Sequence, residues 1–288
     1  MSVVVKVVVF VVGYLIIHLL DAKCALAWGP GVHTALALNS LNSASLLLPS
    51  VAQVITSFPI EYIYGCLSAD FFIGKGKKTY KKNPHTWEGG FKFLRGAKDD
   101  RETAYALGFL SHLAADVIAH NFFIPNLLSA YPGRGKMGHL FWEIRADYRI
   151  GAAYTRIARG ILDMDHQICD DLLKLIGGKK KNGFKAGKGF FAQTVKFSDR
   201  ICTTRELFFE TRVVRWRHFH GYLALMLGLS RSLANDFLKQ PETSVCLLHD
   251  PMGTHNLLLA KKKQAFPRFF RNPRPVRRFD VDKNLLSL

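Results

Sequence analysis

Apolar side chains recur at intervals of three and four residues along most of the chain, and this periodicity constrains the fold more than any other feature. Such spacing puts one face of an α-helix against a core, whereas the strict alternation of a half-buried strand is absent after the first 27 residues. The sequence therefore predicts an all-α protein. Glycine and proline mark the joins, for example at Asn83-Pro84 and Gly177-Gly178. We expect helices over residues 31–43, 50–57, 59–73, 84–97, 101–123, 137–176, 190–236 (with a break) and 254–265.

The first 27 residues have the pattern of a secretory signal peptide. An apolar run over residues 3–20 is followed by Ala25-Leu26-Ala27, a small-x-small cleavage site. Cleavage there would make Trp28 the first residue of an exported protein, secreted or held in the periplasm or cell envelope, and would free its α-amine to chelate a metal. The apolar run is also long enough for an uncleaved membrane anchor, so this alternative stays open.

The charge of the chain indicates a class of partner without identifying one. The formal net charge is +18, and it becomes +17 when Lys6, Lys23 and Asp21 leave with the leader. A surface this basic attracts polyanions, which include nucleic acid, anionic lipid and outer-membrane polysaccharide. Two basic segments stand out. Residues 179–188 are expected to form a flexible loop, and residues 261–278 a poorly ordered tail. The phenylalanines expected to be available there to insert or stack are Phe266, Phe269, Phe270 and Phe279.

The domain organisation follows from these segments. We expect a signal peptide over 1–27, one helical domain over 28–260, and a basic tail containing Phe and Pro over 261–288. Four cysteines remain after the leader, an even number that allows one or two disulfides in an exported chain. None has the Cys-x-x-Cys spacing of a zinc ligand pair. These cysteines are Cys66, Cys169, Cys202 and Cys246.

The strongest local motif places three titratable side chains on one stripe of an apolar helix. His112, Asp116 and His120 follow one another at steps of four, so each lies one turn above the last, with a drift of about 40° per step. His112 and Asp116 can share one cation. His120 lies about 12 Å along the axis from His112, which indicates a second ion. The alternative is a helix with a polar solvent face, since bare burial of three such groups would cost several kcal/mol.

Each of the other candidate ligands is weak evidence for a metal site when it is taken alone. His139 and Glu143 repeat the spacing of four, and a His with a carboxylate one turn away suits zinc, but such pairs also occur on solvated helix faces. Asp70 ends an apolar stretch, where the alternative is a carboxylate held by a nearby lysine. His85 follows a proline at a helix start, and His33 follows Gly-Pro-Gly, so each could also be an ordinary surface or core histidine.

Asp147 lies one turn beyond Glu143. It could orient a ligand histidine through a hydrogen bond. A helix salt bridge with Arg145 or Arg149 is an equally good interpretation.

Order and spacing together give a more specific signal than any single motif. The candidates form the series W-H-D-H-H-D-H-H-E, set in the strings WGPGVH, YGCLSAD, HTW, GFLSHLAADVIAH and GHLFWE. This series resembles the zinc-dependent phospholipase C family of three-zinc bacterial enzymes, whose multi-helix fold is shared with single-strand-specific zinc nucleases. The resemblance covers residues 28–150 strongly and the C-terminal half weakly. It implies an all-α bundle with a zinc cluster between helices.

The resemblance also implies about three zinc ions per chain. Asp116 would bridge two of them, one oxygen to each, and Asp70 would double as ligand and general base. The implied ligands are Trp28 (α-amine and carbonyl), His33 and Asp116 for one zinc; Asp70, His85, His112 and Asp116 for a second; and His120, His139 and Glu143 for the third.

The sequence departs from the phospholipases at several spacings, and these affect the expected substrate. Trp28 and His33 are five residues apart, as in the nucleases, and Asp116 and His120 are four apart where both relatives have six. The last ligand is Glu143, as in the phospholipases. We therefore expect hydrolysis of phospholipid to diacylglycerol and a phosphorylated head group at a membrane surface. An exported single-strand nuclease and a non-catalytic, zinc-stabilised envelope-binding protein remain the alternatives.

Overall fold

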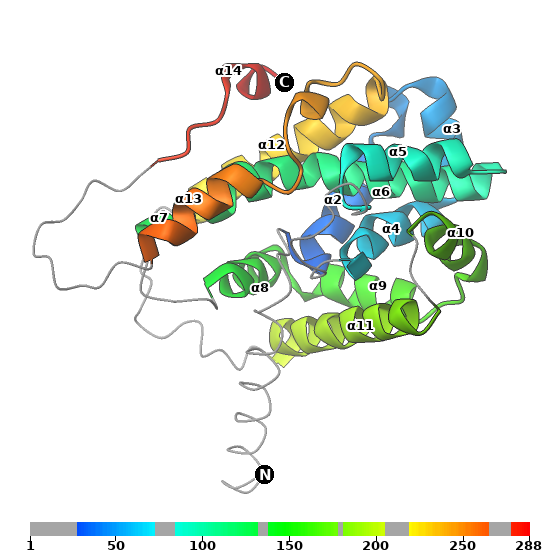
Figure 1. Cartoon of the computed structure of the whole chain (residues 1–288), viewed down its shortest axis with the longest axis horizontal. Coiled ribbons are helices and arrows are strands. Elements are labelled where there is room, and N and C mark those ends of the chain that lie inside the picture. The colour runs from blue at the N-terminus through cyan, green and yellow to red at the C-terminus, as the bar shows by residue number, and fades with distance from the viewer. Residues whose placement is uncertain (1–27, 73–83, 132–137, 178–180, 205–218, 265–277) are drawn as a thin grey trace, which may run out of the picture.

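The structure is a computed structural model, and it describes residues 28–72, 84–131, 138–177, 181–204, 219–264 and 278–288. Within these ranges all regular elements are helical, which confirms the predicted all-α fold (Figure 1). The α-helices are Pro30–Asn42 (α2), Pro49–Ser57 (α3), Pro59–Ser68 (α4), Trp87–Gly96 (α5), Asp100–Ile118 (α6), Ile124–Ala130 (α7), Gly138–Ile150 (α8), Ala152–Leu162 (α9), Gln167–Gly177 (α10), Lys181–Thr204 (α11), Phe219–Lys239 (α12), Thr254–Gln264 (α13) and Lys283–Leu286 (α14). Shorter helical turns are Ala44–Leu46 (η1), Ala69–Phe72 (η2), Ala119–Phe123 (η4, a π-helix) and Val245–Leu248 (η6).

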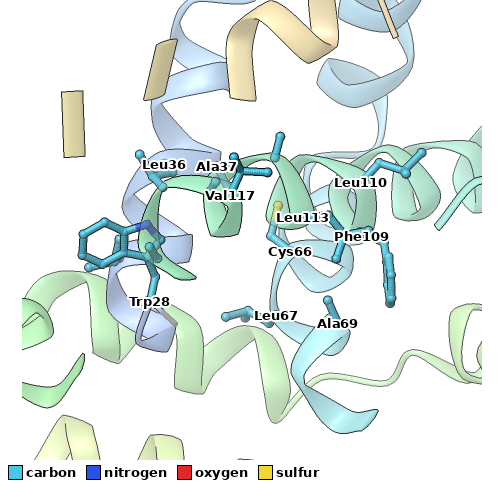
Figure 2. Close-up of a cluster of buried hydrophobic side chains, with 14 of the residues drawn as sticks. Trp28, Leu36, Ala37, Cys66, Leu67, Ala69, Phe109, Leu110, Leu113 and Val117 are labelled. Atoms are coloured by element: carbon cyan, nitrogen blue, oxygen red, sulfur yellow. The ribbon is translucent and has the colours of Figure 1, made fainter. Parts of the chain in front are cut away.

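Helix α6 is the central element, and α4, α5 and α12 pack directly against it. Asp99 caps its start by accepting a hydrogen bond from the Glu102 amide at 2.8 Å. Residues 104–120 are all buried, so this helix faces protein on every side. Figure 2 shows apolar side chains of α2, α4 and α6 meeting along it. Any polar group between residues 104 and 120 must therefore find its partner inside the protein.

The helical stretch Asp100–Ala130 has the length and hydropathy of a membrane span. However, 94% of its apolar window is buried inside the protein. Burial against α4, α5 and α12 accounts for this hydropathy, because a helix enclosed by a core needs no polar face.

The predicted helix over 137–176 is three helices in the structure. Gly151, with φ 111°, separates α8 from α9. This positive φ is accessible to glycine without strain, so the chain can turn there. A second break at residues 163–166 separates α9 from α10. Periodicity alone did not reveal these breaks, because apolar spacing of three to four continues across them.

The prediction of a flexible loop over 179–188 is wrong from Lys181 onward, where α11 begins. Phe184 is only 2% exposed, and Lys188 pairs with Asp170 of α10 at 2.6 Å. These tertiary contacts outweigh the low helix propensity of the glycines in this stretch. Residues 178–180 lie outside the described residues.

The chain after α13 is also partly packed against the domain. Residues 261–264 continue α13, and Phe279 is 8% exposed with its amide and carbonyl hydrogen-bonded to the Asn126 side chain at 2.9 Å each. Leu285 of α14 is 1% exposed. Phe279 is therefore not available to insert or stack, contrary to the expectation for a loose tail. Residues 265–277, most of the basic segment, lie outside the described residues.

The one or two disulfides that the even number of cysteines allowed are not formed: all four cysteines are free and buried. They lie on four separate elements, α4, α10, α11 and η6. Burial raises the pKa of the thiols of Cys169, Cys202 and Cys246 to about 12, and raises that of Cys66 further. These residues are core hydrophobes rather than reactive thiols.

Candidate metal centre

The polar stripe that runs along α6 into η4 is buried rather than exposed to solvent. His112, Asp116 and His120 are 1%, 0% and 1% exposed. This excludes a solvated polar face. Three titratable groups in such a core must be satisfied by one another, by neighbouring elements or by a bound ion.

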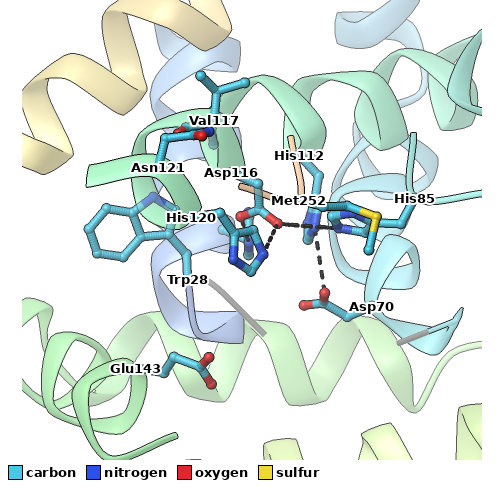
Figure 3. A network of polar contacts seen from close by, with 12 residues as sticks. Trp28, Asp70, His85, His112, Asp116, Val117, His120, Asn121, Glu143 and Met252 are labelled. Atoms are coloured by element: carbon cyan, nitrogen blue, oxygen red, sulfur yellow. Dashed lines mark hydrogen bonds and ion pairs between the residues drawn. The ribbon is translucent and has the colours of Figure 1, made fainter. Parts of the chain in front are cut away.

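Four of the predicted ligands converge into one cluster, called here the quartet: Asp70, His85, His112 and Asp116 (Figure 3). They come from η2, the segment before α5, and α6, and their ligand atoms lie within 4.8 Å of one another. The Asp116 Oδ2 atom is 3.1 Å from His112 Nε2 and 3.2 Å from His85 Nε2. The two histidine Nε2 atoms are 3.0 Å apart, and Asp70 Oδ1 is 3.5 Å from His112 Nε2.

The geometry of the quartet fits a zinc ion. Ligand atoms held at about 2.0–2.1 Å from a tetrahedral zinc lie about 3.3 Å from one another, close to the spacings in the quartet. Asp70 Oδ1 and both carboxylate oxygens of Asp116 are buried, and no described residue donates a hydrogen bond to them. Carboxylate oxygens buried without donors are costly, and a cation between them removes that cost.

The backbone fixes the tautomer of one quartet histidine. His112 Nδ1 donates to the Cys66 carbonyl of α4 at 2.7 Å. In the neutral ring this tautomer directs the Nε2 lone pair at the carboxylates, the arrangement that a metal ligand requires. Helix α4 therefore orients His112 and, through η2 at its end, also carries Asp70.

The two carboxyl groups of the quartet differ in acidity. Burial raises the pKa of Asp70 to about 7, against the opposing effect of the His112 ring. Burial would also raise the pKa of Asp116, but the His112 and His33 rings hold it well below its usual range. Asp116 is thus the charged centre, and Asp70 is the group able to exchange a proton near neutral pH.

Asp116 faces a second set of predicted ligands with its other oxygen. His33 Nε2, from α2, lies 3.3 Å from Asp116 Oδ1, and the His33 ring stacks on His112 with centroids 3.8 Å apart. Trp28 is fully buried next to α2; its indole Nε1 donates to Ser230 Oγ at 3.0 Å and its ring lies 4.5 Å from Phe123. One carboxylate therefore lies between two groups of candidate ligands.

The remaining three predicted ligands are His120 and the His139–Glu143 pair of α8. His139 Nε2 is 3.2 Å from Glu143 Oε1 on α8, and the rings of His120 and His139 meet edge to face at 5.7 Å. His120 Nε2 is also 3.6 Å from Asp116 Oδ2, so this ring lies between the quartet and the α8 pair. Burial lowers the pKa of His120 to about 4, which keeps its imidazole neutral and able to bind a metal.

Asp147 has a role that neither sequence interpretation anticipated. Its fully buried carboxylate accepts hydrogen bonds from the backbone amides of Gly31 and Val32 at 3.1 and 2.9 Å, and from Ser198 Oγ at 3.2 Å. It neither orients a histidine nor pairs with Arg145 or Arg149. Burial raises its pKa to about 6. One sequence feature could have indicated this role. The N-cap of α2 is Gly29, which has no side chain to cap the helix, so an acceptor must come from elsewhere.

Fold and site together define an all-α protein with a buried His/carboxylate centre suited to divalent metal. The sequence model of the zinc-dependent phospholipase C family matches residues 32–184, and the chain belongs to that family. This confirms the family resemblance. The matched range contains all the predicted ligands except Trp28. No curated protein and no solved structure matches the chain.

Proposed function

We propose that this protein is an exported zinc-dependent phospholipase C that hydrolyses phospholipid to diacylglycerol and a phosphorylated head group. The observation that carries the proposal is the buried quartet, in which Asp70 Oδ1 and both Asp116 oxygens face histidine nitrogens at ligand spacing and receive no hydrogen bond from the described part of the chain. Family membership supports the reaction class, and the basic surface supports action at anionic membranes.

The proposed zinc ligands are the nine positions of the sequence series, in three sites. Asp116 would belong to both of the first two sites, an assignment supported by the separate histidine neighbours of its two oxygens. The first site has Trp28, His33 and Asp116; the second has Asp70, His85, His112 and Asp116; the third has His120, His139 and Glu143. Zinc in such sites polarises phosphoryl oxygens and makes water acidic enough to act as a nucleophile near neutral pH.

The protein's own residues position and deprotonate the reactants. Asp70 accepts the proton of the attacking water, a role supported by its burial in the quartet with Oδ1 3.5 Å from His112 Nε2. Asp116 stays ionised and holds the His33 and His112 rings around the reaction site. The apolar walls of α6 exclude bulk water, which strengthens every charge interaction within the site.

Trp28 enters the proposal through its backbone. Removal of residues 1–27 frees its α-amine, which joins its carbonyl as a chelating pair beside His33. The fixed position of the buried Trp28 side chain, held by Ser230 and Phe123, supports this assignment. Signal-peptide cleavage is then an activating step as well as an export step.

The test compares two substrates with one protein. Metal-replete mature protein is assayed on phosphatidylcholine vesicles and on single-stranded DNA, each with and without a chelator. Asp70→Asn serves as the inactive reference, because it preserves shape while removing the base. Chelator-sensitive release of diacylglycerol by wild type but not by Asp70→Asn is the expected result.

Single-strand nuclease activity is the second candidate, and one observation favours it. Trp28 and His33 are separated by five residues, the spacing of the nucleases. The net positive charge would also attract a nucleic-acid backbone. Zinc-dependent cleavage of single-stranded DNA, with no diacylglycerol from any phospholipid, would make this the better assignment.

A further inference from the structure

We infer that Asp147 is a positioning residue that holds the N-terminal ligand segment, residues 28–33, against helix α8. The inference rests on the zinc ligands proposed above. Asp147 lies on α8, one turn beyond Glu143, and binds the first turn of α2. It thus connects the segment that supplies Trp28 and His33 to the helix that supplies ligands of the third site.

The hydrogen bonds are those that a helix start requires. The first amides of a helix have no partner within the helix and form the positive end of its dipole. In α2 the N-cap is Gly29, which has no side chain to accept them. The Asp147 carboxylate replaces that cap from another helix, with Oδ2 on the Gly31 amide and Oδ1 on the Val32 amide.

The glycines of this segment make room for the carboxylate. A Cβ atom added to Gly29 would lie 2.4 Å from Asp147 Oδ2. One added to Gly31 would lie 2.9 Å from Thr155 Cγ2 and 3.0 Å from Asp147 Oδ1. A side chain at Gly29 would displace Asp147, and one at Gly31 would displace Thr155 or Asp147. The two glycines of Gly-Pro-Gly therefore leave the space that the Asp147 carboxylate occupies.

The consequence for the centre follows from the shortness of the segment. His33 lies one residue beyond the anchored Val32 amide, and its Nε2 atom is 3.3 Å from Asp116 Oδ1. Metal ligands tolerate displacements of only a few tenths of an ångström. If Asp147 no longer accepts from these amides, the start of α2 loses its anchor. The zinc affinity of the site that contains Trp28 and His33 should then fall.

The test is zinc content in Asp147→Asn, measured on the complete mature chain after dialysis. Asparagine keeps the shape, but one of its two terminal groups becomes an NH₂ donor facing a backbone N–H, so one amide loses its acceptor. We expect one of three zinc ions to bind about 10–100-fold more weakly, the usual effect of removing a residue that supports a ligand. The other two should remain.

Asp199→Asn is the matched control. Asp199 is also buried, on α11, and accepts from Thr155 Oγ1 and Arg159 Nη1 at 3.1 Å each. Its substitution should leave zinc content unchanged. Ser198→Ala removes only the third hydrogen bond to Asp147 and is the milder variant. It should weaken the binding of the same zinc ion, and it replaces Asp147→Asn in the test if that variant fails to fold.

A double variant separates positioning from general destabilisation. If Asp147 acts through the site of His33, the double variant with His33→Ala should lose no more zinc than His33→Ala alone. The inference is overturned if neither Asp147→Asn nor Ser198→Ala weakens a zinc site more than Asp199→Asn, or if the losses add in the double variant. Wild type without zinc would refute the proposed function instead.

Discussion

Asp116→Asn gives the sharpest test of the proposed centre, because this side chain serves two sites. Its Oδ1 lies 3.3 Å from His33 Nε2, and its Oδ2 lies 3.1 Å from His112 Nε2. Asparagine is nearly the same size, but it is uncharged and presents an NH₂ donor on one side. The substitution should therefore empty two sites, whereas His120→Ala should empty only the third.

The size of the effect can be worked out from mass action. At free zinc about a hundredfold above each dissociation constant, an occupied site adds about 2.7 kcal/mol to the free energy of unfolding. Three sites then add about 8 kcal/mol in wild type, two add about 5.4 in His120→Ala, and one adds about 2.7 in Asp116→Asn. For a chain of this size, 1 kcal/mol shifts Tm by about 2–4 °C. The zinc-induced shifts in Tm should therefore stand in a ratio of about 3:2:1.

The assay is thermal unfolding of each protein with excess zinc and again with a chelator. Only the difference between the two melts is compared, so the cost of the cavity left by His120→Ala cancels. Metal analysis on the same samples should give about three, two and one zinc ions. Equal zinc-induced shifts in the two variants would refute the bridging role of Asp116, and no shift in wild type would refute the metal centre itself.

Three further predictions follow from the same geometry. One extra residue before Trp28 should weaken the binding of one zinc ion and lower the activity. Metal analysis of proteins with defined N-termini measures this, and unchanged zinc content would rule out the α-amine as a ligand. Chelation should also speed proteolysis of the mature wild-type chain, because its ligands come from several separate helices; an unchanged digestion rate would mean that the ions are peripheral. Replacing the five arginines of residues 268–278 with glutamine should weaken binding to anionic vesicles while sparing hydrolysis of a small soluble phosphodiester, provided that Phe279 is kept to hold the chain against Asn126; equal vesicle binding would remove this segment from the membrane surface.

Sequence alone was sufficient for the fold class, the family and the local pairs of candidate ligands. Helical periodicity is a property of neighbouring residues, so it predicted an all-α chain and placed His112 beside Asp116 and His139 beside Glu143, as the structure has them. The order of nine polar positions was specific enough to indicate the family, which the match over residues 32–184 confirms. The assignment of ligands to individual zinc ions stays a prediction.

Tertiary structure alone decided how distant residues meet. The family resemblance implied that Asp70 and His85 share a site with His112 and Asp116, but the contacts between them depend on how α4 and the start of α5 pack on α6. No local pattern encodes this packing, because it results from long-range burial. For the same reason the sequence did not predict the helix over 181–188, which is held by the Lys188–Asp170 pair, and left open whether the cysteines pair. The bonds of Asp147 to Gly31 and Val32 span more than a hundred residues, and the amides they satisfy are present at every helix start, so only the folded chain shows which acceptor reaches them.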